Sequence, residues 1–173
     1  MEEYNKSLNV DYTFDNFNVD LDNGSAYTIT VDLAEKMGRI SKPLYLTGPD
    51  GKGKTHLLNA MANYIIANDK SVKVGYISVE EFDNELYEAI KNNAIGSFRD
   101  KYEALDIFIV DDLSIVIRKM FSKNELLKIM LKLKEAGKLV IAADSLTIEE
   151  LKERGLPDGY FDVFEGASKV AIE

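Results

Sequence analysis

Short apolar runs alternate along the chain with longer segments in which apolar residues recur every three or four positions. The apolar runs predict buried strands, and because they lack polar alternation they indicate a parallel sheet covered by helices on both faces. The longer segments have the spacing of amphipathic helices. We expect strands near residues 44–46, 72–78, 107–110, 139–143 and 168–172, and helices near residues 25–37, 54–68, 79–92, 95–104, 122–136 and 147–154. Ser122 is the expected N-cap of the fifth helix, and the whole pattern predicts one α/β domain over residues 25–173.

The first 24 residues lack this alternation and are rich in Asn and Asp. They carry four scattered aromatic residues, Tyr4, Tyr12, Phe14 and Phe17. We expect residues 1–24 to form an extended lead-in whose aromatic side chains pack on the α/β domain.

The composition is that of a folded domain, because 46% of the 173 residues are hydrophobic and 29% are charged. The absence of Cys and the single His exclude disulfides, thiolate metal sites and multi-histidine metal sites. No apolar run approaches the ~20 residues of a membrane-spanning helix, and the acidic N-terminus does not resemble a signal peptide. We therefore expect a cytoplasmic protein with no membrane partner. Its net charge of −9 opposes non-specific binding to the phosphate backbone of DNA.

A phosphate-binding motif follows the first expected strand, because residues 48–55 (GPDGKGKT) match G-x-x-x-x-G-K-S/T in full. In this motif the glycines let backbone N–H groups turn toward phosphates, Lys54 can reach the terminal phosphates, and Thr55 can place its hydroxyl on Mg²⁺. A strand before the loop and a helix after it complete the context, so the sequence predicts a nucleotide site. Its expected binding residues are Gly48, Pro49, Asp50, Gly51, Lys52, Gly53, Lys54, Thr55 and His56. The alternatives are a plain Gly-rich turn, a loop that no longer binds nucleotide and, for His56, an ordinary residue in the first helical turn.

Acidic residues follow two later strands, at the edge where a nucleotide-bound Mg²⁺ needs a carboxylate. Asp111 is expected to hold the metal together with Thr55, and Asp112 is expected to polarise the attacking water. Asp144 ends the next strand and could sense the γ-phosphate or orient water. With Lys54, Asp112 and Asp144 are the candidate catalytic residues, and the alternative for each Asp is a role in forming a turn.

Further segments complete a pattern that covers about residues 8–172. They are residues 11–17 (DYTFDNF), 53–60 (GKTHLLNA), 76–82 (YISVEEF), 98–102 (FRDKY), the pair Asp111 and Asp112, and residues 135–138 (EAGK). In this order they resemble the AAA+ domain of the bacterial replication initiator DnaA and its regulator Hda. Helicase loaders of the DnaC type share some of these motifs and are a weaker match.

The resemblance implies a P-loop NTPase with the five-stranded parallel base of AAA+ proteins and with ATP or ADP and Mg²⁺ between neighbouring protomers. It implies that Phe17 and Val19 lie by the adenine and that Asp144 follows the nucleotide state. The implied role is bacterial replication initiation or its regulation. The implied partners are a DnaA-type initiator, the replicative helicase or further copies of the chain through the nucleotide face. The open alternatives are an interaction module that needs no nucleotide and a switch of the helicase-loader type.

The chain departs from the family in its catalytic parts. The similarity ends before the family's helical lid, with its γ-phosphate-sensing Arg, and before its DNA-binding domain. Asp162 or Val163, depending on the alignment, stands at the position of the arginine finger, and Arg154 lies several residues early. Because such a finger is worth roughly 10³- to 10⁵-fold in rate, we expect weak ATPase activity at most.

A second departure concerns DNA. Residues 80–103 hold three basic and seven acidic residues, a net charge of −4, whereas a channel for single-stranded DNA needs the opposite sign. Lys119 resembles a basic position that the family uses on DNA, but Phe121 replaces the neighbouring Arg. The sequence therefore argues against DNA binding, and Arg118 with Lys119 is interpreted as a solvated basic pair near a helix start.

Overall fold

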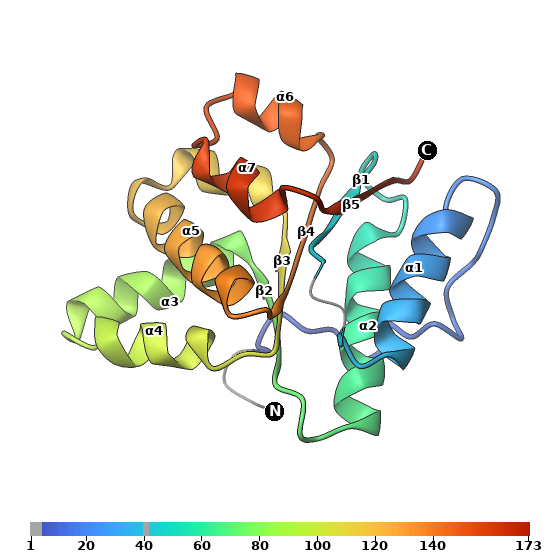
Figure 1. Cartoon of the computed structure of the whole chain (residues 1–173), viewed down its shortest axis with the longest axis horizontal. Coiled ribbons are helices and arrows are strands. Elements are labelled where there is room, and N and C mark those ends of the chain that lie inside the picture. Colours follow the sequence, from blue (N-terminus) through green and yellow to red (C-terminus); the bar gives the residue numbers. More distant parts are fainter. Residues whose placement is uncertain (1–4, 40–41) are drawn as a thin grey trace.

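The computed structural model describes residues 5–39 and 42–173, so Tyr4 lies outside the described residues. A five-stranded sheet forms the centre of the molecule, with its strands in the order β2-β3-β4-β1-β5 (Figure 1). Every neighbouring pair of strands is parallel. The strands are β1 (Leu44–Thr47), β2 (Val74–Ser78), β3 (Ile107–Asp111), β4 (Leu139–Asp144) and β5 (Ser168–Ala171). The predicted five-stranded parallel sheet is confirmed.

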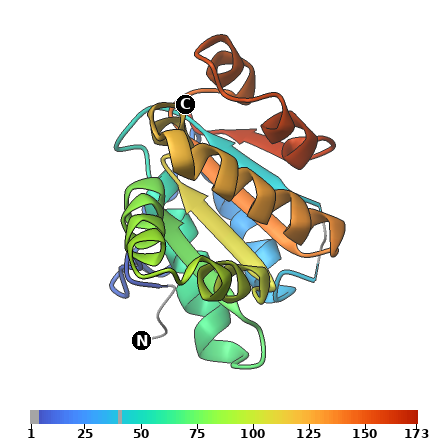
Figure 2. The ribbon, with the colours of Figure 1, turned by 90° about the vertical axis from the view of Figure 1, so that its left-hand side faces the viewer.

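Helices cover both faces of the sheet, as Figures 1 and 2 show. On one face lie α1 (Gly24–Glu35) and α2 (Lys54–Asn68). The other face carries α3 (Val79–Lys91), α4 (Ile95–Glu103), α5 (Met120–Glu135), α6 (Ile148–Glu153) and α7 (Gly159–Phe164). Among the described residues no helix is both long enough and apolar enough to cross a membrane.

The apolar character of the strands follows from this double cover. Side chains alternate between the two faces of a strand, so both sets must be apolar when helices lie on both sides. In β3, Phe108 and Val110 pack in the cluster beneath α3 to α7, whereas Ile107 and Ile109 pack in the cluster beneath α1 and α2. All four side chains are fully buried.

The start of α5 corrects one prediction. The helix begins at Met120, so Ser122 is not its N-cap but lies inside its first turn, fully buried. Its Oγ donates a hydrogen bond of 2.5 Å to Oδ1 of Asp83 on α3. A partner 39 residues away therefore satisfies the hydroxyl, which local sequence patterns could not reveal.

Two short elements were not predicted. A 3₁₀ helix, η1 (Leu113–Arg118), follows β3, and α7 lies near the C-terminal strand. Each has six residues, fewer than two α-helical turns, so neither shows a helical period. Burial of Tyr160, Val163 and Phe164 in the core fixes α7.

The lead-in packs along α2 and the edge of the sheet through polar groups as well as aromatic rings. Buried Asn5 forms two backbone hydrogen bonds with β2, donating to the Val74 carbonyl at 2.9 Å and accepting from the Tyr76 N–H at 2.8 Å. The ring of Phe14 contacts that of Tyr27 on α1, edge to face, at 5.8 Å. These contacts bring the lead-in to the loop that precedes α2.

Candidate nucleotide site

Other parts of the chain lie close against both ends of the loop between β1 and α2. Gly48 and Gly53 have φ angles of 148° and 101°, which L side chains rarely adopt. A Cβ on Gly48 would lie 2.2 Å from the carbonyl oxygen of Ile172, and one on Gly53 would lie 2.6 Å from the ring of Phe17. Glycine is therefore required at both positions, for backbone conformation and for space.

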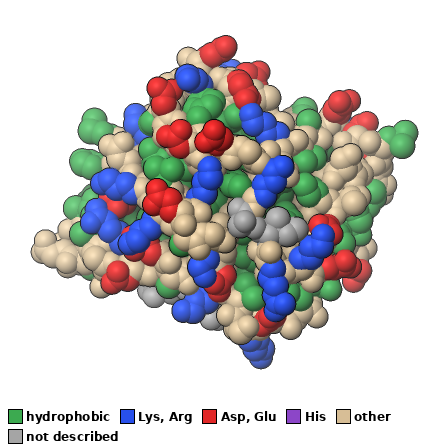
Figure 3. Space-filling view, in the orientation of Figure 1, with side chains coloured by type: hydrophobic (Ala, Val, Ile, Leu, Met, Phe, Trp, Pro, Cys, Tyr) green, Lys and Arg blue, Asp and Glu red, His purple; other side chains and the backbone are tan. Residues whose placement is uncertain are grey.

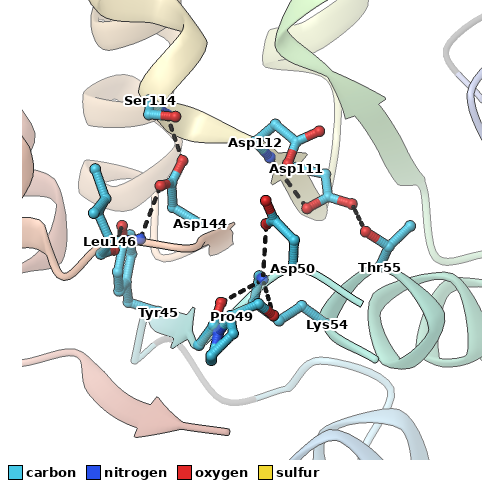
Figure 4. Close-up of polar contacts among 11 residues, drawn as sticks. Tyr45, Pro49, Asp50, Lys54, Thr55, Asp111, Asp112, Ser114, Asp144 and Leu146 are labelled. Carbon is cyan, nitrogen blue, oxygen red and sulfur yellow. Dashed lines mark hydrogen bonds and ion pairs between the residues drawn. The ribbon is translucent and has the colours of Figure 1, made fainter. Parts of the chain in front are cut away.

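Lys54 begins α2 and turns its side chain back over this loop (Figure 4). Its Nζ donates hydrogen bonds to the carbonyl oxygens of Gly48 at 2.5 Å and Pro49 at 3.1 Å. Asp50 Oδ1 lies 3.8 Å from the same nitrogen. Only 5% of the lysine side chain is exposed, so its positive charge is concentrated at the loop.

Thr55 and Asp111, the two residues predicted to hold Mg²⁺, are in direct contact. Thr55 Oγ1 donates to Asp111 Oδ2 at 2.7 Å, and the backbone N–H of Asp112 donates to Asp111 Oδ1 at 3.1 Å. The hydroxyl of Tyr76 on β2 also donates to Asp111 Oδ2, at 2.8 Å. Burial, followed by the charge of Asp111, raises the pKa of Tyr76, so this phenol keeps its proton. Tyr76 was not a predicted site residue, because its hydroxyl partner lies on the adjacent strand.

The residues fit a magnesium ion that arrives with a nucleotide. Within the described ranges, no group of three or more His, Cys, Asp and Glu side chains could hold a metal ion. Mg²⁺ bound to nucleotide phosphates needs only one or two protein ligands, because phosphates and waters supply the rest. One hydroxyl and one buried carboxylate, Thr55 and Asp111, meet that need.

Asp112 follows the metal-binding candidate in a left-handed backbone conformation, with φ 57°. Desolvation and then the charges of Asp111, Asp144 and Asp50 raise the pKa of its carboxyl above the ordinary range for Asp. Its negative charge is therefore unfavourable in the free protein, as expected where several carboxylates face one lysine. The expected role of Asp112 in polarising the attacking water stays a prediction.

Asp144 is buried at the end of β4, and backbone amides occupy both of its carboxylate oxygens. Oδ2 accepts from the N–H of Ser114 at 2.6 Å, and Oδ1 accepts from the N–H of Leu146 at 3.0 Å. These bonds join the end of β4 to η1 and to the following turn (Figure 4). Such hydrogen bonds are expected if Asp144 serves to form a turn. The expected role of Asp144 in sensing the γ-phosphate stays a prediction.

The lead-in and the loop enclose a pocket of about 360 Å³ beside the phosphate motif. Phe17 and His56 line it, together with residues of the loop, whereas Val19 is not among its lining residues. The His56 ring stacks on Tyr12 with 4.5 Å between centroids, and its Nε2 lies 2.8 Å from the Thr13 carbonyl oxygen. His56 therefore joins the lead-in to α2 at the pocket wall.

The candidate arginine-finger positions provide no guanidinium. Val163 is fully buried inside α7, and Asp162 is exposed on the same helix. Arg154, the nearest arginine in sequence, is the C-cap of α6.

Carboxylates pair with Lys119 and with the basic residues of the segment 80–103. Arg118 is exposed, and Lys119, whose side chain is 34% exposed, has its Nζ 2.8 Å from Asp83 Oδ2. Neighbouring Phe121 is 70% exposed. In residues 80–103 each basic side chain has an acidic partner: Arg99 with Glu125, Lys101 with Glu85, and Lys91 with Glu88. Acidic and basic side chains are interspersed on the face seen in Figure 3. These pairings leave less positive charge for a nucleic acid than the sequence alone would indicate.

Comparisons with known proteins agree on one family. The family model of the bacterial DnaA ATPase domain matches residues 8–155. The chromosomal replication initiator protein DnaA of Thermosipho africanus is 39% identical over 147 residues, which are 84% of this chain and 33% of that protein. DnaA of Gloeobacter violaceus is 38% identical over 151 residues, covering 86% and 34%. This chain therefore spans about a third of the length of these relatives.

Solved structures show the same similarity. Domain III of the Thermotoga maritima replication initiation protein DnaA matches with a TM-score of 0.87 and 34% identity, over 96% of this chain and 68% of that one. AMPPCP-bound DnaA from Aquifex aeolicus matches with a TM-score of 0.86 and 32% identity, over 96% and 51%. The DnaC helicase loader, at 16% identity and a TM-score of 0.79 over 94% and 97%, shares the fold.

Proposed function

Because this chain belongs to the family of bacterial DnaA ATPase domains, we propose that it binds ATP or ADP with Mg²⁺ at residues 48–55. The proposal rests on one observation: at the carboxyl ends of the strands, Thr55 contacts Asp111, and Lys54, the residue before Thr55, turns its side chain over the phosphate loop. Binding of AMPPCP by a relative with the same fold supports it.

Each residue has a role in this proposal. Lys54 binds the terminal phosphates, while Thr55 and Asp111 hold the metal. Tyr76 and the backbone N–H of Asp112 orient the Asp111 carboxylate through their hydrogen bonds. The bound Mg²⁺ supplies neutralisation of phosphate charge. Phe17 and His56 line the adjacent pocket, in which we propose that the nucleotide base binds. Val19, the other residue expected near the adenine, follows Phe17 by two positions in the sequence.

Hydrolysis is proposed to be slow. Asp112 is the candidate to polarise water, and Asp144 is the candidate to respond to the γ-phosphate. Neither Asp162 nor Val163 can neutralise the charge that develops in phosphoryl transfer, which an arginine finger does. The chain would therefore act as a nucleotide-dependent binding protein more than as a fast enzyme.

We further propose a cytoplasmic role in bacterial replication initiation or its regulation. The curated relatives are replication initiators, and in this chain the nucleotide face would contact a DnaA-type initiator, the replicative helicase or a second copy. Light scattering in the presence of ATP tests the initiator contact. A complex with the same organism's initiator is expected, and none would overturn this part.

Calorimetric titration of the chain with MgADP and with MgATP tests the nucleotide proposal. We expect saturable binding to one site, weaker by at least about tenfold when EDTA removes the metal, because Mg²⁺ links the phosphates to Asp111. A folded chain that binds neither nucleotide would contradict the proposal and favour the nucleotide-independent interaction module.

Tyr76→Phe tests the proposed orientation of Asp111. Loss of the 2.8 Å hydrogen bond is expected to raise the Mg²⁺ concentration needed for half-maximal nucleotide binding by about tenfold, the usual cost of losing a partner of a metal ligand. Magnesium titration at fixed ADP measures it. Tyr160→Phe is the control, since this buried phenol donates instead to the Lys123 carbonyl. An equal response of the two variants would refute the orienting role.

A further inference from the structure

Asp50 places a carboxylate in the middle of the phosphate loop, next to its lysine. Its Oδ1 lies 3.8 Å from Lys54 Nζ, and 91% of its side chain is exposed. Figure 4 shows the side chain pointing from the loop toward the side on which Asp111 and Asp112 lie. The acidic group therefore faces the same space as the ammonium that the motif supplies for phosphate.

Geometry limits how far a bound phosphate can lie from this carboxylate. A phosphate oxygen that accepts a hydrogen bond from Lys54 Nζ lies about 2.8 Å from it. Added to the 3.8 Å between Nζ and Asp50 Oδ1, this leaves at most about 6.6 Å between the two anionic groups when both side chains keep the positions seen in the structure. That separation is shorter than the Debye length of ~8 Å at physiological ionic strength, so salt does not screen the repulsion fully.

Apart from Lys54 and the bound Mg²⁺, the surrounding charges do not offset this repulsion. Lys52, the second lysine of the loop, is 3.7 Å from Asp22 of the lead-in and therefore also has a carboxylate neighbour. Asp111, Asp112 and Asp144 stand at the ends of β3 and β4 on the same side of the loop. Each additional negative charge on a bound nucleotide therefore meets an environment that is already acidic.

We propose that Asp50 is a specificity-determining residue that lowers the affinity of this site for ATP relative to ADP. It does so by competing with the terminal phosphate for Lys54 and by repelling the additional charge of the triphosphate. The inference rests on the proposed nucleotide function. For one extra charge at ~6.6 Å, Coulomb's law in a water-like dielectric gives about a threefold effect, and a lower dielectric gives more.

Asp50→Asn tests the proposal, since it removes the charge and keeps the shape. Dissociation constants for MgATP and MgADP are measured by calorimetry at low and high salt. We expect the ratio of the ATP constant to the ADP constant to fall at least about threefold at low salt, and by less at high salt. Asp50→Glu, which keeps the charge, is expected to stay near the parent ratio.

Asp32→Asn is the matched control. Asp32 forms an ion pair with Lys36 at 2.6 Å, and the two residues are four positions apart in the sequence, as Asp50 and Lys54 are. It lies on α1, whose C-terminal end leads to Gly38 beside Ile107, the first residue of β3. Asp32 therefore lies toward the end of the sheet at which the strands begin, away from the phosphate loop. Removal of its charge should leave the ratio of the ATP and ADP dissociation constants unchanged.

The possible results distinguish failure of the proposed role of Asp50 from failure of the proposed nucleotide binding. Equal changes for ATP and ADP in Asp50→Asn, or an unchanged ratio, overturn the role of Asp50 while nucleotide binding itself stands. An equal shift in Asp32→Asn overturns it too, since the effect would then follow net charge. If the parent protein is folded and binds neither nucleotide, the proposed function fails and the inference fails with it.

Discussion

Lys54→Ala is expected to weaken MgADP binding by about a hundredfold. Hydrogen bonds from a charged donor contribute about 1.5–3 kcal/mol each, and every tenfold in affinity corresponds to about 1.4 kcal/mol. The side chain of Lys54 is 5% exposed, and its ammonium is already directed at the loop carbonyls. Calorimetry on the parent and the variant measures the difference.

Lys52→Ala is the control for this prediction. Lys52 belongs to the same loop and carries the same charge, but it is 46% exposed and faces Asp22 of the lead-in at 3.7 Å. Exposed ion pairs contribute little, so we expect less than about a threefold change in affinity. Equal losses in the two variants would show that only the overall charge of the loop matters. An unchanged Lys54→Ala would show that phosphates do not bind at this loop.

Phe82→Ala is expected to destabilise the fold by about 3–5 kcal/mol, the usual cost of truncating a buried aromatic side chain. Phe82 is fully buried on α3, and its ring contacts those of Phe98 and Tyr102 on α4 at 5.2 and 5.3 Å. These rings hold the α3–α4 pair on the sheet. Urea unfolding measures the loss of stability.

Tyr87→Ala controls for the change of helix composition, since Tyr87 lies on the same helix and is 66% exposed. We expect it to change the free energy of unfolding by less than about 0.5 kcal/mol. MgADP affinity of the folded Phe82→Ala protein should stay near that of the parent, because this ring does not line the loop or its pocket. A small loss of stability in Phe82→Ala would contradict the proposed cluster.

The elements that the sequence predicts well are those whose cause is local. The helix near 54–68 was predicted with the observed bounds, because the Gly-rich loop ends at Gly53 directly before it and the apolar residues from Leu57 to Ile65 have helical spacing. Strands β1 to β4 follow from apolar runs, whereas β5 (Ser168–Ala171) includes Lys169 and is only partly buried. Ser122 was misread because a distant group, Asp83, decides its role, and η1 and α7 were missed because each is too short to show a helical period.

Some features of the site could likewise be predicted from the sequence, and others could not. The phosphate motif and the acidic pair mark Lys54, Thr55 and Asp111 in the sequence; the fold brings Thr55 into contact with Asp111 and places Lys54 over the phosphate loop. The hydrogen bond from Tyr76 to Asp111 depends on the register between β2 and β3, which the sequence pattern does not determine. The boundary of the lead-in at residue 24 and the roles of the individual site residues stay predictions.

Amide chemical shifts of the ¹⁵N-labelled chain during a titration with MgADP are the sharpest test of nucleotide binding at residues 48–55, because they show both binding and its location. We expect the largest changes in residues 48–55, with further changes in Phe17 and Asp112. Little change is expected along α4 and α7, outside the proposed site. Shifts confined to other surfaces, or no shifts at saturating MgADP, would contradict nucleotide binding at residues 48–55.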